Sequence, residues 1–198
     1  MTREPIPATT VKEFMDLRSS RNGRWQLVDG EPRAMVSTPL AHSVMLAKLC
    51  RLFGNHLREA GTPGYAIPMA GVVPHLGARY NLRVPDLSIT RDGPEGEDRW
   101  LTSPMLVVEL LGPENHAETW GNIWACSTIP SVEEMLVLHV GQVGADLLRR
   151  GADGHWPREP ERLAGGDLVL HSIGLRFALA DLYGATQQRP TAGSPEAA

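Results

Sequence analysis

Three short segments of this chain place a carboxylate inside or at the end of an apolar run. The segments are 25–31, 84–87 and 106–110, and their candidate acids are Glu31, Asp86 and Glu109. A carboxylate among Val and Leu residues lies where burial is expected, and burying an unpaired charge costs several kcal/mol. Three such residues on three predicted strands indicate a shared partner, and a divalent cation is the simplest partner for carboxylates.

The chemistry that such a site would serve is phosphodiester hydrolysis. That reaction needs an activated water and a neutralised phosphate, and one or two Mg²⁺ ions can supply both. Because Mg²⁺ prefers hard oxygen ligands and usually takes one or two protein carboxylates, Asp86 and Glu109 suit it if their strands are neighbours. The backbone carbonyl of Leu110 is a candidate third ligand. Glu31 could hold a second ion or orient the water.

Each acid also has a structural explanation. Asp86 follows Pro85 and could be a turn residue that bonds its own backbone. Glu31 comes directly after the Asp29-Gly30 pair and could be exposed on an edge strand. A solvated Glu109 is hard to reconcile with the buried run around it, so Glu109 is the strongest of the three candidates.

The first part of the chain predicts a helix followed by a hairpin. Thr10 and Glu13 have the spacing of a capping box, which begins a short helix over 11–17. Asp29-Gly30 is a strong hairpin signal between a weakly alternating strand at 24–28 and a second strand at 31–36.

The rest of the chain predicts a mixed α/β fold. The longest helical pattern follows Pro39 and runs to about Ala60. Pro104–Leu111 is a continuous apolar strand of the kind buried on both faces. Further strands are predicted at 84–90, 135–140, 145–150, 168–171 and 175–177, and a helix at 115–127. We expect a central sheet with Asp86 and Glu109 on neighbouring strands and the long helix on one face.

Composition limits the possible functions. The 198 residues suit one domain, expected over 1–185, with a disordered tail at 186–198. A net charge of −4 argues against a general basic surface for nucleic acid. Two cysteines predict no disulfide framework, and the absence of a signal peptide or a long apolar run predicts a soluble, cytoplasmic protein.

The order of these motifs resembles that of the Uma-two family, bacterial proteins placed in the PD-(D/E)xK nuclease superfamily. The resemblance covers roughly residues 8–183. It rests on 11–14, 25–31, His42, 84–87, 106–113, 129–137 and 174–183.

The resemblance implies a restriction-endonuclease-like mixed central sheet flanked by helices, with an N-terminal helix plus hairpin. It implies that Asp86 and Glu109 bind Mg²⁺ or Mn²⁺, that Glu31 is an accessory acid and that His42 belongs to the site. DNA is the implied substrate, and a homodimer is expected because many nucleases pair to cut two strands.

This chain departs from the family pattern at one position. The family places a lysine on the helix after the Glu strand, four residues before an aromatic residue, and here these places hold Trp120 and Trp124. Loss of that lysine could cost about 3 kcal/mol in catalysis. The two tryptophans share a helix face, which favours packing in a core or interface or, alternatively, stacking on an unpaired base.

Several residues could replace the lysine: Lys48 from the long helix, His42 or His116 as a base, or Asn122 as a group that orients water. The leading hypothesis is therefore a divalent-metal-dependent DNA endonuclease. The alternatives are a catalytically degenerate nuclease fold that binds DNA or protein, and a structural protein organised by dimerisation.

Overall fold

The computed structural model describes residues 8–18, 22–61, 63–93 and 99–183, so the tail predicted at 186–198 lies outside the described residues. Its helices are α1 (Val11–Arg18), α2 (Leu40–Glu59) and α3 (His116–Cys126), followed by a 3-10 turn, η1 (Leu179–Leu182). Across the described residues, no helix is long and apolar enough to cross a membrane.

A six-stranded sheet forms the centre of the molecule, in the order β3-β4-β5-β6-β7-β8. Its strands are β3 (Tyr65–Pro68), β4 (Leu87–Thr90), β5 (Pro104–Leu111), β6 (Glu134–His139), β7 (Ala145–Arg149) and β8 (Glu161–Leu163). β5 runs parallel to β6, and the other neighbouring pairs are antiparallel. The expected mixed α/β fold is therefore confirmed, with the strand after Asp86 beside the strand that carries Glu109.

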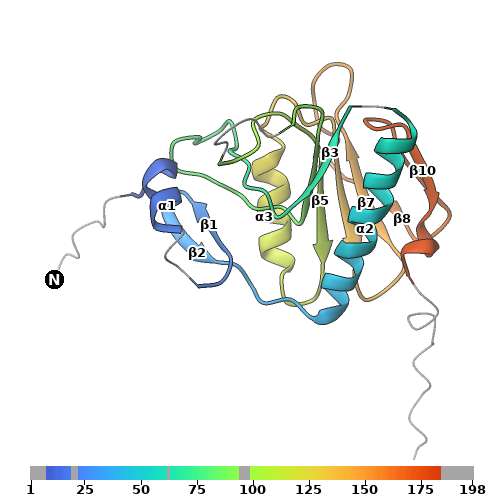
Figure 1. The fold of residues 1–198 in the computed structure, drawn as a ribbon, viewed down its shortest axis with the longest axis horizontal. Coiled ribbons are helices and arrows are strands. Elements are labelled where there is room, and N and C mark those ends of the chain that lie inside the picture. The colour runs from blue at the N-terminus through green and yellow to red at the C-terminus, as the bar shows by residue number, and fades with distance from the viewer. Residues whose placement is uncertain (1–7, 19–21, 62, 94–98, 184–198) are drawn as a thin grey trace, which may run out of the picture.

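The two long helices cover opposite faces of this sheet (Figure 1). Leu106, Val108 and Leu110 of β5 belong to the same core cluster as α2, whereas Val107 packs in the cluster that contains Ile123 of α3. Because side chains alternate along a strand, β5 is buried on both faces.

The N-terminal helix and hairpin form as the local sequence predicts. At the start of α1 the Thr10 N–H donates to Glu13 Oε2 at 2.8 Å, and the Glu13 N–H donates to Thr10 Oγ1 at 3.3 Å. β1 (Trp25–Val28) and β2 (Glu31–Ala34) form a separate two-stranded sheet. Asp29 (φ 50°) and Gly30 (φ 80°) give its turn two left-handed residues, as a two-residue type I′ turn requires.

The sequence predicted the two C-terminal strands but not that they form a sheet separate from the central one. β9 (Asp167–Leu170) and β10 (Leu175–Ala178) pair only with each other in an antiparallel sheet. Leu168, Leu170 and Leu175 pack into the same core cluster as α2, so this hairpin covers that side of the molecule. Strand β8 was not expected, because three residues with one half-buried side chain carry almost no apolar pattern.

Candidate active site

Asp86 lies immediately before β4, and its carboxylate is enclosed by groups from distant elements. The residue is 3% exposed. Its Oδ2 accepts the Leu110 N–H at 2.8 Å and Nε2 of His42 at 3.1 Å. Its Oδ1 lies 4.0 Å from Nη1 of Arg24. These bonds reach β5, α2 and the start of the hairpin, which argues against a simple turn role for Asp86.

Glu109 lies in the middle of β5, on the face that α3 covers. It is 4% exposed, and its Oε1 accepts the side-chain amide of Asn122 at 3.0 Å. Burial raises the pKa of Glu109 well above its usual range, and the neighbouring charge of Asp86 raises it further. Two carboxyl groups this close, shielded from water, need a proton or a cation to neutralise them.

The donor set suits a hard divalent ion. The Glu109 carboxylate is next to Asp86, and Oδ1 of Asn122 is buried without a hydrogen-bond partner. An orphaned buried amide oxygen is costly unless something binds it. No group of three or more His, Cys, Asp or Glu residues suited to a metal occurs in the described part of the chain. Mg²⁺ needs only one or two protein carboxylates and takes neutral oxygens and waters for the rest, so two acids suffice.

The carbonyl of Leu110, the candidate third ligand, accepts the side-chain amide of Asn115 at 2.9 Å. A carbonyl oxygen has a second lone pair, so this bond leaves one acceptor position. Ligation by Leu110 stays a prediction.

Glu31 is placed differently from what its apolar surroundings predict. Its side chain is 67% exposed and forms an ion pair with Arg33 at 2.9 Å, on the outside of the hairpin. Of the two readings that the sequence left open for Glu31, the structure has the exposed one, because the strand that contains it is a hairpin edge with a mostly exposed burial pattern. An accessory catalytic role for Glu31 stays a prediction.

Of the residues that could replace the family lysine, two contact the carboxylate pair and two lie elsewhere. Lys48 points elsewhere, since its Nζ donates to the carbonyl of Leu182 at 2.7 Å. His116 lies on the flank of α3 opposite Glu118, beside Trp120. His42 and Asn122 do reach the carboxylate pair. The helix thus turns Asn122, rather than the residue at the lysine's place, toward Glu109.

Arg24 is the cation that sequence reasoning missed. Its Nη1 faces Asp86 and also contacts Sδ of Met69 at 3.3 Å, while Nη2 reaches the Val36 carbonyl at 3.4 Å. Arg24 precedes β1, so the hairpin must dock beside the sheet for it to reach Asp86. The only sequence signal was a loose cluster of arginines around it.

The hairpin docks through a carboxylate on α3. Glu118 Oε1 accepts the side-chain amide of Gln26 at 3.2 Å, and Glu118 Oε2 accepts the Val36 N–H at 3.0 Å. These two bonds tie both ends of the hairpin to α3.

Met69 holds Asp86 from the other side in an unusual backbone conformation. Its φ is 55°, and its N–H donates to the Asp86 carbonyl at 3.1 Å. A left-handed conformation is unfavourable for a residue with a long side chain and persists only where neighbours enforce it. Here it directs the thioether toward Arg24.

A cavity of about 460 Å³ opens beside these groups. It is lined by Arg24, Thr38, His42, Ser43 and Met69 among others. The hydroxyl, imidazole and guanidinium groups give it donors suited to an anionic ligand. Arg24 and His42 link this cavity to the site, since both line it and both face the carboxylate of Asp86.

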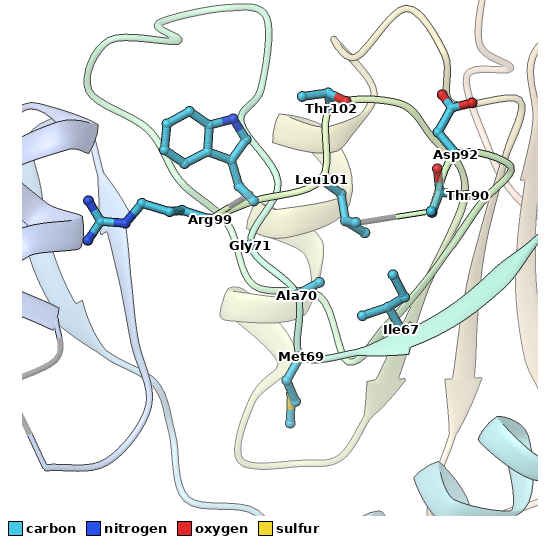
Figure 2. A pocket seen from close by; sticks show the side chains of 11 residues that line it. Ile67, Met69, Ala70, Gly71, Thr90, Asp92, Arg99, Leu101 and Thr102 are labelled. Atoms are coloured by element: carbon cyan, nitrogen blue, oxygen red, sulfur yellow. The ribbon is translucent and has the colours of Figure 1, made fainter. Parts of the chain in front are cut away.

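A second hollow, of about 240 Å³, also has Met69 in its lining (Figure 2). Ile67, Met69 and Leu101 give it a largely apolar lining. Arg99 turns away from it toward α1, where its Nη1 pairs with Asp16 at 2.8 Å. This hollow therefore brings no cation toward the carboxylates.

The chain is a mixed α/β protein whose central sheet encloses a pair of buried acids. Its fold matches the crystal structure of "a putative nuclease belonging to DUF820" from Anabaena variabilis ATCC 29413, with a TM-score of 0.68 at 14% identity, covering 85% of this chain and 96% of the other. Residues 11–180 match the Uma2 family, described as "Putative restriction endonuclease", and the chain belongs to that family.

A relative in Synechocystis sp. (strain ATCC 27184 / PCC 6803 / Kazusa) is 29% identical over 185 residues. The match covers 90% of this chain and 93% of the relative, which is described as "Uncharacterized protein slr1290".

Proposed function

We propose that this protein is a divalent-metal-dependent DNA endonuclease that hydrolyses phosphodiester bonds. The observation that carries the proposal is the buried pair of Asp86 and Glu109, whose charges require a neutralising partner. Membership of the Uma2 family supports it. Asp86 and Glu109 would hold Mg²⁺ or Mn²⁺, with the Leu110 carbonyl as a third ligand. The ion would supply phosphate neutralisation and a more acidic water.

The remaining groups have distinct proposed roles. His42 fixes the orientation of Asp86 through its 3.1 Å bond and is the candidate general base, because the residue is also part of the cavity lining. Arg24 supplies the positive charge that the missing lysine would have provided, from the opposite side of the site. Asn122 holds Glu109 in place.

A cleavage assay with supercoiled and linear duplex DNA tests this proposal. Wild-type protein should nick DNA in Mg²⁺ or Mn²⁺, and D86A should abolish both cleavage and ion binding measured by calorimetry. The control is D167N, which alters an exposed carboxylate of the β9–β10 hairpin that pairs with Arg176. Undiminished cleavage by D86A would refute the assignment of Asp86.

The second candidate is a nuclease fold that binds without cutting. It is favoured by one observation: the group that α3 presents to Glu109 is the neutral amide of Asn122. Under this alternative, wild-type protein would bind DNA or a protein partner in either divalent ion and leave the DNA intact.

We further propose that the protein acts in the cytoplasm as a homodimer, which would present one site to each strand of a duplex. The mass measured by light scattering tests this part separately. A monomer that still cuts both strands would exclude it.

A further inference from the structure

A third pocket, of about 600 Å³, lies on the flank of α3 that faces away from Glu118. We call it the tryptophan pocket. Its lining includes Trp120, Trp124, His116, His139, Asp146 and Arg162. None of these side chains contacts Asp86 or Glu109 through a described hydrogen bond or ion pair. The carboxylate site therefore does not account for them.

The two indoles form a preassembled aromatic surface. Their centroids are 6.1 Å apart with 31° between the planes, and Trp124 is 49% exposed. A planar group inserted between the two rings would need a separation of about 7 Å, twice the usual carbon contact distance of ~3.5 Å, so the rings are too close together to admit one. The open face of Trp124 is therefore the available stacking surface, and Trp120 supports it from behind.

Polar groups line the pocket together with the indoles. Asp146 is 7% exposed, and its Oδ2 accepts Nε2 of His139 at 2.8 Å. Its Oδ1 lies 3.7 Å from Nε of Arg162, whose side chain is 81% exposed. Gly144 leaves space for the imidazole, since a Cβ there would lie 2.8 Å from Nδ1 of His139. The buried acid thus holds one imidazole and one guanidinium at the pocket.

We propose that the tryptophan pocket binds an unpaired nucleobase of a single-stranded nucleic acid segment. A base has a flat face for Trp124, polar edges within reach of His116 and His139, and a phosphate for Arg162. Every base offers such a face, so sequence preference should be weak. This inference rests on the proposed nuclease function for the identity of its ligand, and it predicts a preference for single-stranded or locally opened substrate.

Packing in a core explains the pocket less well. An indole half exposed to solvent has not been buried by its own fold, and a purely apolar interface would not need the His139–Asp146–Arg162 set. A second copy of the chain is an alternative occupant that the experiment must separate.

Fluorescence anisotropy with labelled ten-nucleotide single strands tests the proposal, in EDTA so that ion-dependent cleavage cannot occur. W124A should weaken binding about tenfold or more, the loss typical of one base–aromatic stack, and W124F should restore most of it. Y65A is the matched control, because Tyr65 is also 49% exposed but lies on β3. Circular dichroism checks that each variant folds.

Three results would overturn the inference: no binding of single strands by wild-type protein, equal losses for W124A and Y65A, or a dimer that W124A dissociates without any effect on oligonucleotide binding. The proposed nuclease function fails differently. If D86A and wild-type protein both leave DNA uncut while W124A still weakens single-strand binding, the pocket stands and the hydrolysis does not.

Discussion

At the scale of single residues, the site depends on how two adjacent acids are neutralised. Asp86 receives an N–H, an imidazole and a nearby guanidinium, whereas Glu109 receives one neutral amide. Glu109, the acid with fewer hydrogen-bond partners, is also the one whose pKa is raised by burial. Glu109 is therefore the residue at which binding of a proton and binding of an ion compete.

Replacing Glu109 with Gln should stabilise the ion-free protein at high pH. Since the folded state raises the pKa of Glu109 above its unfolded value, the native state binds more protons between those two pKa values, and stability falls as pH rises through that window. A tenfold difference in proton affinity between the folded and unfolded states corresponds to about 1.4 kcal/mol. In urea, E109Q should exceed wild type at pH 8 and match it near pH 4.

Adding Mn²⁺ at pH 8 should recover the lost stability in wild type but not in E109Q. If wild type gained stability relative to E109Q as pH rose without ions, Glu109 would be ionised and already paired in the fold, contrary to its buried surroundings.

His42 offers a test that separates orientation from proton transfer. H42A should weaken Mn²⁺ binding by about 10- to 100-fold, because a group that orients a metal ligand typically contributes that much. H42Q can still donate to Asp86 and should recover ion binding. If H42Q also recovered cleavage, His42 would be a positioning residue and not the base.

At the scale of elements, the β1–β2 hairpin completes the site by docking on α3 through Glu118. Its turn has little freedom. Gly30 has φ 80°, and a Cβ there would lie 2.5 Å from Cβ of Ala8 and 3.0 Å from its Cα. The turn therefore has both a conformational and a steric reason for glycine.

G30A should destabilise the protein by about 1–3 kcal/mol and lower cleavage, since a displaced hairpin carries Arg24 away from Asp86. Its control is G54A. Gly54 lies within α2, and a methyl group added there would meet no neighbouring atom within 4 Å, so alanine should stabilise by about 0.5–1 kcal/mol. Denaturant unfolding of both variants checks the pair, and equal effects would contradict the steric argument.

Local patterns predicted the elements better than their docking. The capping box at Thr10, the apolar run of β5 and the long α2 were evident because each signal lies within one segment. The contacts of Arg24 and Glu118 were not, since their partners are 62 and 82–92 residues away along the chain. Burial of Asp86 and Glu109 followed from their apolar neighbours, whereas the sequence left Glu31 open between exposure on an edge strand and a place in the site, and its side chain is exposed at the hairpin edge.

At the scale of the whole molecule, charge limits how the protein can hold DNA. The net charge is −4, so affinity for phosphates must come from local groups rather than from a general field. The cavity beside Asp86 and the tryptophan pocket each contain one arginine, Arg24 and Arg162. We expect weak duplex binding with a shallow dependence on salt.

R24Q should reduce the slope of log affinity against log salt concentration by about one, the value expected for one lost phosphate contact. R176Q, which alters an exposed arginine paired with Asp167, should leave the slope unchanged. Titration of a labelled duplex at several salt concentrations in EDTA measures both. An unchanged slope for R24Q would mean that Arg24 serves Asp86 alone.

The acids and the nearest cation come from separate parts of the chain. The acids lie in or next to the central sheet, and the arginine precedes a hairpin that docks on α3. Evolution can therefore alter one without rebuilding the other. A substitution at the hairpin can change the charge beside the acids while the sheet that holds them keeps its architecture.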